Sequence, residues 1–229
     1  MQYGRGKLLQ LRVPKENKGV EVRYDGQMTI DIETIHFALK SHDPVRHTVG
    51  ETTRTAAVAA ILKQTAGHTE ALFILRATKD GDPWSGQMAF PGGHIESFDA
   101  SSKDAAIRET QEEIGLDLNV HARYLGALNE VKANPRSRQI DMVVSPHLFV
   151  LENHDVNFAP NYEVADVLWG SLNDMYHGRS ATQTQFAMKD DMQTFPGYDV
   201  GGQVVWGLTM RMVEDVFSMI DPKWASLGE

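Results

Sequence analysis

The amino-acid sequence predicts a fold of mixed α/β (α+β) class, in which helices cover both faces of a central mixed sheet. Strand-like segments outnumber helical ones, and several strands separate the long helical segments along the chain. Hydrophobic residues make up 41% of the 229 residues, which is enough for a substantial core. This length fits one large domain, or a domain with an extension.

Composition excludes several classes of protein. The net charge of −9, from 31 acidic against 22 basic residues, argues against nucleic-acid binding over the whole surface. The chain has no cysteine, so disulfides, thiolate metal sites and a cysteine nucleophile are excluded. No apolar run is long enough to span a membrane, and the first residues lack an apolar signal core. A cytoplasmic protein is therefore the expectation.

Residues 1–50 are predicted to form an N-terminal extension, and residues 51–229 the main domain. Short strands and turns are expected up to residue 30, followed by an amphipathic helix over Ile30–Lys40 and a polar connector over Ser41–Thr53. We expect the N-terminal extension to extend the sheet or to build the interface of a homodimer.

The first half of the main domain is predicted to contain two buried strands, a loop and a helix. Apolar runs place the strands at Thr55–Lys63 and Glu70–Arg76, and Gly and Pro content places a loop at Asp80–Gly86. A short extended piece runs into the glycine turn at Pro91-Gly92-Gly93. The helix is expected over Ser101–Ile114, because serine can cap its start and Gly115 can adopt the left-handed conformation after its end.

The second half is predicted to alternate strands and loops before a closing helix. Pro146 is expected to mark a bend or an edge of its strand, because proline cannot donate to a sheet ladder. Polar residues and Pro196-Gly197 indicate a loop or lid over Ala181–Val200. The predicted elements are strands over Leu118–Asn129, Ile140–Leu151 and Glu163–Trp169, a loop over Val131–Arg138, a short helix over Leu172–Tyr176, and a helix after Gly207.

The central helix carries a cluster of carboxylates. Glu109, Glu112 and Glu113 stand at i, i+3 and i+4, so they share one face and would repel one another. A hard divalent cation such as Mg²⁺ or Mn²⁺ would neutralise them, and the turn at Gly93 offers a backbone carbonyl as a further ligand. The alternative, from spacing alone, is a solvated helix with an acidic stripe.

Gly93 is followed by Asp99 and then by Arg108-Glu109-Thr110-Gln111-Glu112-Glu113-Ile114-Gly115-Leu116. This full pattern resembles the Nudix box. Three features depart from the family pattern: aspartate stands at position 99 in place of glutamate, eight residues rather than seven separate it from Arg108, and Thr110 replaces an aliphatic residue. A one-residue insertion with aspartate is similar to the coenzyme A pyrophosphatase branch of the family.

The resemblance implies a fold, a metal site and roles for individual residues. The implied fold is an α/β/α sandwich around a mixed sheet, with the box as a loop-helix-loop that holds Mg²⁺ or Mn²⁺. Glu109, Glu112 and Glu113 would ligate the metal, together with Gly93. Arg108 would orient the cluster by pairing with Asp99. The general base would be one of these glutamates or one outside the box; the candidates outside it are Glu163 and, more weakly, Glu130.

Resemblance to the coenzyme A pyrophosphatase branch extends over about residues 53–220, but it is partial. That branch carries a second arginine upstream of the glycine turn, and this chain has Lys79-Asp80-Gly81-Asp82 there instead. Substrate contacts are expected from an aromatic ring and from cations. The alternatives are that Trp84 is held against the core, which is the more common role of a loop tryptophan, and that the cations belong to a solvated loop. The residues concerned are Arg76, Trp84, Lys132, Arg136 and Arg138.

Three functions remain open at this point. The first is a metal-dependent hydrolase that cleaves the diphosphate linkage of a nucleoside diphosphate derivative, such as coenzyme A, a nucleoside diphosphate sugar, ADP-ribose or a dinucleotide. The second is a non-catalytic Nudix-fold module that binds a nucleotide or regulates another protein. The third is a prenyl-diphosphate isomerase of the same fold, which the absence of cysteine disfavours. The expected partner in the first two cases is a small nucleotide.

Overall fold

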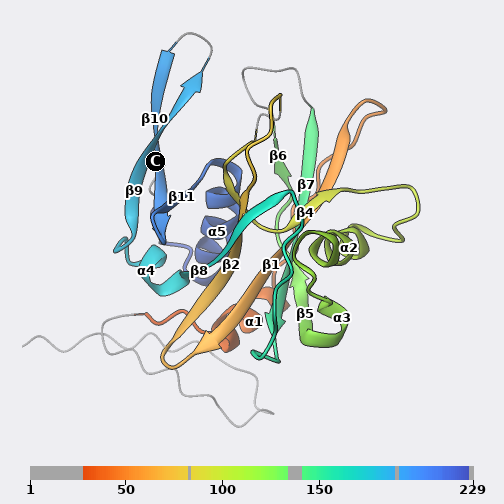
Figure 1. The fold of residues 1–229 in the computed structure, drawn as a ribbon. Coiled ribbons are helices and arrows are strands. Elements are labelled where there is room, and N and C mark those ends of the chain that lie inside the picture. Colours follow the sequence, from red (N-terminus) through yellow and green to blue (C-terminus); the bar gives the residue numbers. More distant parts are fainter. Residues whose placement is uncertain (1–27, 82–83, 134–140, 189–190, 227–229) are drawn as a thin grey trace, which may run out of the picture.

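A computed structural model describes residues 28–81, 84–133, 141–188 and 191–226, and it contains an eight-stranded mixed sheet with helices on both faces (Figure 1). The path through the sheet is β3-β2-β1-β7-β5, while β4 pairs with β1, β6 with β7 and β8 with β2. The strands are β1 (Arg54–Thr65), β2 (His68–Arg76), β3 (Met88–Ala89), β4 (Gly92–His94), β5 (Ala122–Ala127), β6 (Val131–Lys132), β7 (Met142–Leu151) and β8 (Val164–Ser171).

Strands β1 and β7 form the centre of the sheet. They pair in parallel from Arg54 opposite Met142 to Leu62 opposite Val150, and the other pairs in this sheet are antiparallel. Every residue of β7 is buried. The strands expected over Thr55–Lys63 and Glu70–Arg76 are therefore confirmed as β1 and β2.

Pro146 lies in the middle of β7, so the prediction of a bend or an edge there was wrong. Its carbonyl oxygen accepts from the backbone N–H of Leu128, which lies between β5 and β6. Since the N and C=O of one strand residue point to the same side, the missing N–H of Pro146 falls at the break between these two short strands. Neither β5 nor β6 therefore needs a backbone N–H from β7 at this position, and the proline costs no hydrogen bond between strands.

The helices are α1 (Ile32–Lys40), α2 (Ser102–Ile114), α3 (Leu118–His121), α4 (Leu172–Tyr176) and α5 (Gly207–Ile220). Ala105, Ala106 and Ile114 of α2 pack on one face of the sheet, in a core with Ala57 and Ile61. On the other face, α1 and α5 share a second core with the even-numbered residues of β1. Helices on both faces of the mixed sheet match the predicted fold class.

The N-terminal helix expected over Ile30–Lys40 is present as α1, and its side chains Ile32, Ile35 and Leu39 belong to the main core. The side chain of Asp31 caps it by accepting from the N–H of Thr34. The strands expected before residue 28 lie outside the described residues, and the boundary near residue 50 remains a prediction. The segment Leu118–Asn129 begins with α3 rather than with a strand, because Asp117 caps a helical turn there.

The expectation of a loop or lid over Ala181–Val200 was wrong. Strands β9 (Ala181–Met188) and β10 (Asp191–Val200) form an antiparallel hairpin, and β11 (Gln203–Trp206) adds a third strand. In Figure 1 this hairpin projects from the body of the molecule beside α5. The polar run Thr-Gln-Thr-Gln lacks the apolar content of a core strand, so its sequence did not indicate a strand. Its extended conformation is stabilised by pairing with β10, which in turn packs its buried Tyr198 on α5.

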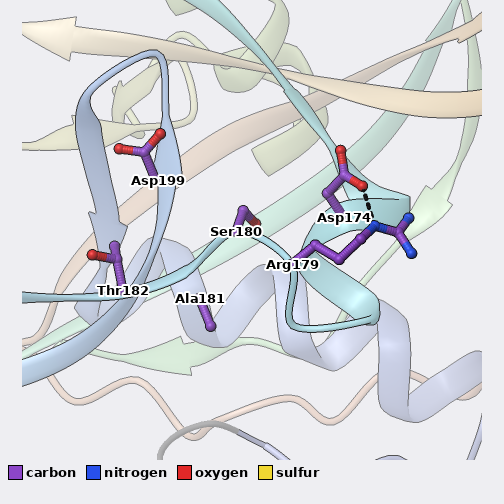
Figure 2. Close-up of a pocket in the computed structure, with 6 residues that line it drawn as sticks. All are labelled: Asp174, Arg179, Ser180, Ala181, Thr182 and Asp199. Atoms are coloured by element: carbon purple, nitrogen blue, oxygen red, sulfur yellow. Dashed lines mark hydrogen bonds and ion pairs between the residues drawn. The ribbon is translucent and has the colours of Figure 1, made fainter.

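A surface pocket lies at the base of this hairpin (Figure 2). It is lined by Asp174, Arg179, Ser180, Ala181, Thr182 and Asp199. Arg179 pairs with Asp174 at 2.6 Å between Nε and Oδ1. None of the site residues predicted from the sequence lines this pocket. No helix of the described part of the chain is both long and apolar enough to cross a membrane.

Candidate active site

The predicted glutamates lie on α2, whose two ends are fixed as the sequence indicated. Ser101 caps the start by accepting from the N–H of Asp104, and Gly115 follows the end with φ of 70°. Thr110, which stands where the family has an aliphatic residue, is completely buried. Its hydroxyl donates to the carbonyl oxygen of Ala106 at 2.7 Å, so a threonine is accommodated in an apolar position without an unsatisfied polar group.

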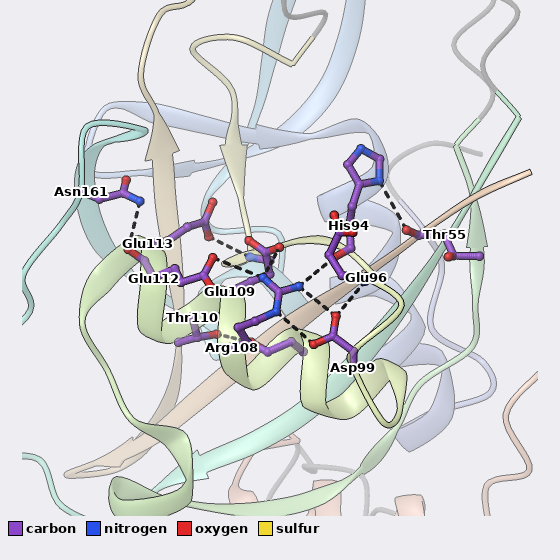
Figure 3. Close-up of polar contacts among 12 residues, drawn as sticks. Thr55, His94, Glu96, Asp99, Arg108, Glu109, Thr110, Glu112, Glu113 and Asn161 are labelled. Carbon is purple, nitrogen blue, oxygen red and sulfur yellow. Dashed lines mark hydrogen bonds and ion pairs between the residues drawn. The ribbon is translucent and has the colours of Figure 1, made fainter.

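The glycine turn brings the backbone against the carboxylates of α2 (Figure 3). Gly92 has φ of 152°, and a Cβ there would overlap the carbonyl oxygen of Ala57 in β1. A Cβ on Gly93 would lie 2.5 Å from Cδ of Glu109. The N–H of Gly92 donates to Oε2 of Glu113 at 2.8 Å. Both glycines are therefore needed for the close approach of β4 to the helix.

Glu113 is almost completely buried, with 2% of its surface exposed. The pKa of Glu113 is raised to about 7, mainly by burial and also by the neighbouring carboxylates of Glu109 and Glu163, while the Gly92 N–H and the charge of Arg76 oppose the shift. The charges of Arg76 and Glu163 both act on the Glu113 carboxyl group, so these two residues belong to the surroundings of the glutamate cluster. The structure thus brings together residues that are up to 87 positions apart in the sequence.

Arg108 holds the cluster together through its guanidinium group. It binds Asp99 in a bidentate manner, with Nε to Oδ1 at 3.0 Å and Nη2 to Oδ2 at 2.9 Å. Its Nη1 also donates to Glu109 at 2.8 Å and to Glu112 at 3.2 Å, and its Nη2 donates to the carbonyl oxygen of His94 at 3.0 Å. The pairing of Arg108 with Asp99 expected from the sequence is present, and it lowers the pKa of Asp99 below its usual value.

Asn161 connects the end of α2 to the segment that carries Glu163, and sequence reasoning missed it. Its side-chain N–H donates to the carbonyl oxygen of Glu112 at 3.0 Å, and its side-chain oxygen accepts from the N–H of Glu163 at 2.8 Å. Its backbone N–H donates to the carbonyl oxygen of Glu113 at 2.8 Å. An asparagine in a loop is ordinary turn chemistry, so the sequence held no distinctive signal for this role.

Glu163 lies close to the end of α2, because Asn161 accepts from its backbone N–H and donates to the carbonyl oxygen of Glu112. Its charge contributes to the raised pKa values of Glu109 and Glu113. Its carboxylate lies 4.0 Å from Nζ of Lys79, which belongs to the stretch where the family branch has an arginine. Glu130, the weaker candidate, is held elsewhere. Its carboxylate accepts from the N–H of His47 at 2.7 Å and from Arg46 at 3.3 Å, so it fastens the N-terminal connector to the domain.

The donor set suits a hard divalent cation. Glu109, Glu112, Glu113 and Glu163 offer carboxylate oxygens, and Gly93 leaves room for the Glu109 carboxylate against the backbone. Among the residues that the structure describes, no three His, Asp or Glu side chains already enclose a metal position. Arg108 contacts Glu109 and Glu112 instead, so a cation at this cluster would compete with the guanidinium for the same oxygens.

The structure describes Trp84 and Lys132, two of the other residues predicted to contact substrate. Trp84 is partly buried against the main core, which is the arrangement expected of a packing residue. Lys132 is exposed on β6, opposite Val143 of β7. Arg136 and Arg138 lie outside the described residues. The substrate-binding roles of these residues remain predictions.

Comparisons with known proteins agree with the resemblance. A mitochondrial coenzyme A diphosphatase of Mus musculus, NUDT8, is 27% identical over 169 residues, which cover 73% of this chain and 78% of that protein. An uncharacterized protein of Schizosaccharomyces pombe is 35% identical over 116 residues. That match covers 50% of this chain and 35% of the relative, so the chain spans about a third of the relative's length.

An Ap4A hydrolase of C. elegans in a binary complex is one of the solved structures to which this chain is similar. It has a TM-score of 0.43 and 23% identity, and the match covers 55% of this chain and 85% of that one. The model of the NUDIX domain family matches residues 53–190, which is more than half of the chain and includes the whole cluster of glutamates. With the Gly93 to Leu116 pattern and this match together, the chain belongs to the Nudix family.

Proposed function

We propose that this chain is a Mg²⁺- or Mn²⁺-dependent pyrophosphohydrolase that cleaves the diphosphate linkage of a nucleoside diphosphate derivative. The observation that carries the proposal is the convergence of four carboxylates, Glu109, Glu112, Glu113 and Glu163, around the glycine turn in a Nudix domain. Such a cluster is costly through like-charge repulsion, and a protein that only needed the fold would have no reason to keep it.

Glu109, Glu112 and Glu113, with the carbonyl group of Gly93, would hold the cation. When bound, the cation would screen the charge of the phosphoryl oxygens and lower the pKa of a water molecule. Arg108 positions Glu109 and Glu112 through its anchor on Asp99. Glu163 is our candidate for the general base, because its loop reaches the cluster from a different element than α2.

Coenzyme A is one candidate substrate, and the likeness to NUDT8 supports it. The chain departs from that branch at the upstream arginine, and Lys79, whose Nζ lies 4.0 Å from the carboxylate of Glu163, is our candidate for a cation in this stretch. Lysine is a point charge and lacks the fork of arginine, so recognition of a phosphate there would be less directional. ADP-ribose, nucleoside diphosphate sugars and dinucleotides therefore remain alternatives.

The test is a panel of these compounds incubated with the full chain and Mg²⁺ or Mn²⁺, with released monophosphates measured by chromatography. We expect turnover of at least one compound and its loss in Glu113→Gln. Glu152→Gln is the matched control, because Glu152 is an exposed glutamate paired with Arg123 outside the site. Full activity in Glu113→Gln would refute the assignment of the site.

The alternative function is a nucleotide-binding or regulatory module without turnover. It would be favoured if no compound of the panel were cleaved while one of them bound in calorimetry. The cytoplasmic location also remains a proposal, and the name of NUDT8 places that relative in mitochondria. Imaging of the tagged full chain distinguishes the two compartments.

A further inference from the structure

The edge of the projecting hairpin carries a surface with unusual properties. Strand β9 is the last strand of its sheet, and its outer edge pairs with no strand among the described residues. Exposed edge strands of natural proteins are commonly protected by lysine, glutamate, proline or a bulge. Residues 181–187, Ala-Thr-Gln-Thr-Gln-Phe-Ala, contain none of these, and β9 is paired in continuous register.

The backbone groups that face this edge can be identified. The N–H of Asp199 donates to the carbonyl oxygen of Ser180 at 2.7 Å, which makes this a hydrogen-bonded pair. Because such pairs alternate along an antiparallel ladder, even-numbered residues of β9 bond to β10. Gln183, Gln185 and Ala187 therefore direct their N–H and C=O groups outward. The N–H of Ala181 is already used by Gly178, at 3.2 Å.

The strand is held in a shape suited to pairing. Phe186 contacts Trp206 with ring centroids 5.0 Å apart, and Phe195 contacts the same ring at 5.2 Å. These contacts fasten one face of the hairpin, while the side chains at 181, 183, 185 and 187 are exposed on the other face. The edge is thus a fixed row of hydrogen-bonding groups that the protein does not cover with its described residues.

We propose that β9 pairs antiparallel with β9 of a second copy of this chain and joins the two hairpin sheets into one. The charge distribution is compatible with this occupant, and the symmetry of the strand favours it. The chain carries −9 overall, so two copies repel each other over most surfaces, but residues 181–187 and 192–198 contain no charged side chain. Two copies can approach along this neutral block without like-charge contacts.

An antiparallel pair of identical strands is self-complementary about a two-fold axis. With the axis at Thr184, Gln183 of one copy lies opposite Gln185 of the other, and Ala181 lies opposite Ala187. Both glutamines then exchange backbone hydrogen bonds across the axis, and small side chains meet at the two ends. The pairing does not involve the glutamates of α2, so it stands independently of the proposed function.

Sedimentation velocity of the full chain tests the proposal. We expect a mass that rises from 25.5 kDa towards twice that value as concentration increases, with dimer abundant at about 100 µM because so small an interface gives modest affinity. Gln185→Lys places like charges near the axis and should weaken the dimer at least about tenfold. Thr194→Lys is the matched control, since Thr194 lies directly across from Gln185 on β10 and away from the edge.

A second variant distinguishes loss of the dimer interface from a folding defect of the hairpin. Gln185→Pro removes an outward N–H and leaves the bonds between β9 and β10 in place, so it should also weaken the dimer while thermal unfolding stays unchanged. A chain that stays monomeric up to about 500 µM, far above a modest dissociation constant, would overturn the proposal. An unchanged dissociation constant in both Gln185 variants would overturn it equally.

Discussion

Asn161 donates its side-chain N–H to the carbonyl oxygen of Glu112 at 3.0 Å, and so links the end of α2 to the loop that carries Glu163. Helix ends leave carbonyl groups without partners inside the helix, and Asn161 satisfies one of them. This link affects the relative positions of the carboxylates. The carboxylates of α2 and that of Glu163 come from different elements, and the amide side chain of Asn161 helps to fix the distance between them, together with the backbone bonds from Asn161 to Glu113 and from Ala159 to Ile114.

We expect Asn161→Asp to lower turnover about tenfold, because a displacement of a catalytic group by less than 1 Å is enough for such a loss. The aspartate can still accept from the N–H of Glu163, but it cannot donate to Glu112. Asn161→Ala loses both bonds and should also lower the free energy of unfolding by about 1–2 kcal/mol. Steady-state kinetics and urea unfolding of the two variants measure these effects, and equal kinetics in all three proteins would contradict the positional role.

Gly93→Ala should abolish most activity while the protein stays folded. The new Cβ would lie 2.5 Å from Cδ of Glu109, so the carboxylate must leave its place beside Arg108. Gly50→Ala is the control, because a Cβ at Gly50 meets only Thr53 Oγ1 at 3.4 Å. Turnover and circular dichroism are measured on both, and an active Gly93→Ala variant would show that the close approach of β4 is not needed.

His147 should make stability depend on pH in the acidic range. It is 4% exposed and contacts Tyr124 and Ser102, and its pKa is lowered from 6.5 to about 4, mainly by burial. Arg46 and Lys103 act in the same direction, while Asp104 and Glu130 oppose it. Because the folded-state pKa is depressed, the contribution of neutral His147 is complete above pH 6.5 and is lost as pH falls towards 4.

The size of this effect is about 3 kcal/mol of unfolding free energy over that range. Urea titrations between pH 7 and 4 measure it. His147→Gln can keep a hydrogen bond and does not titrate, so its stability should change less with pH than that of the parent protein. Identical pH profiles for the two proteins would show that His147 does not cause the dependence.

Mg²⁺ should stabilise the folded protein. At a concentration 100 times its dissociation constant, a cation that binds only the folded state adds about 2.7 kcal/mol, which raises the melting temperature by about 5–10 °C. Glu109→Gln removes one carboxylate and should lose most of this shift, whereas Glu152→Gln should keep it. Differential scanning fluorimetry with and without chelator measures the shift without reference to any substrate.

Local patterns in the sequence predicted those elements that local interactions determine. The two long strands β1 and β2 and the helix α2 with its cap and its terminal glycine follow from apolar periodicity and turn chemistry. The hairpin β9–β10 could not be predicted in this way. Its strands are polar and become ordered by pairing with each other and by the buried side of β10, which no window of sequence shows.

The sequence by itself determined the carboxylate cluster of the proposed site, because carboxylates at i, i+3 and i+4 must share a helix face, and a glycine turn must allow a close approach. Only the tertiary structure decided which distant residues lie beside this cluster. Glu163 reaches the glutamates, whereas Glu130 is held by the N-terminal connector. The hydrogen bonds of Asn161 to Glu112 and Glu163 were also found only in the tertiary structure. The physical reason is that sequence spacing fixes geometry within one element, whereas distances between elements follow from how the cores on both faces of the sheet pack.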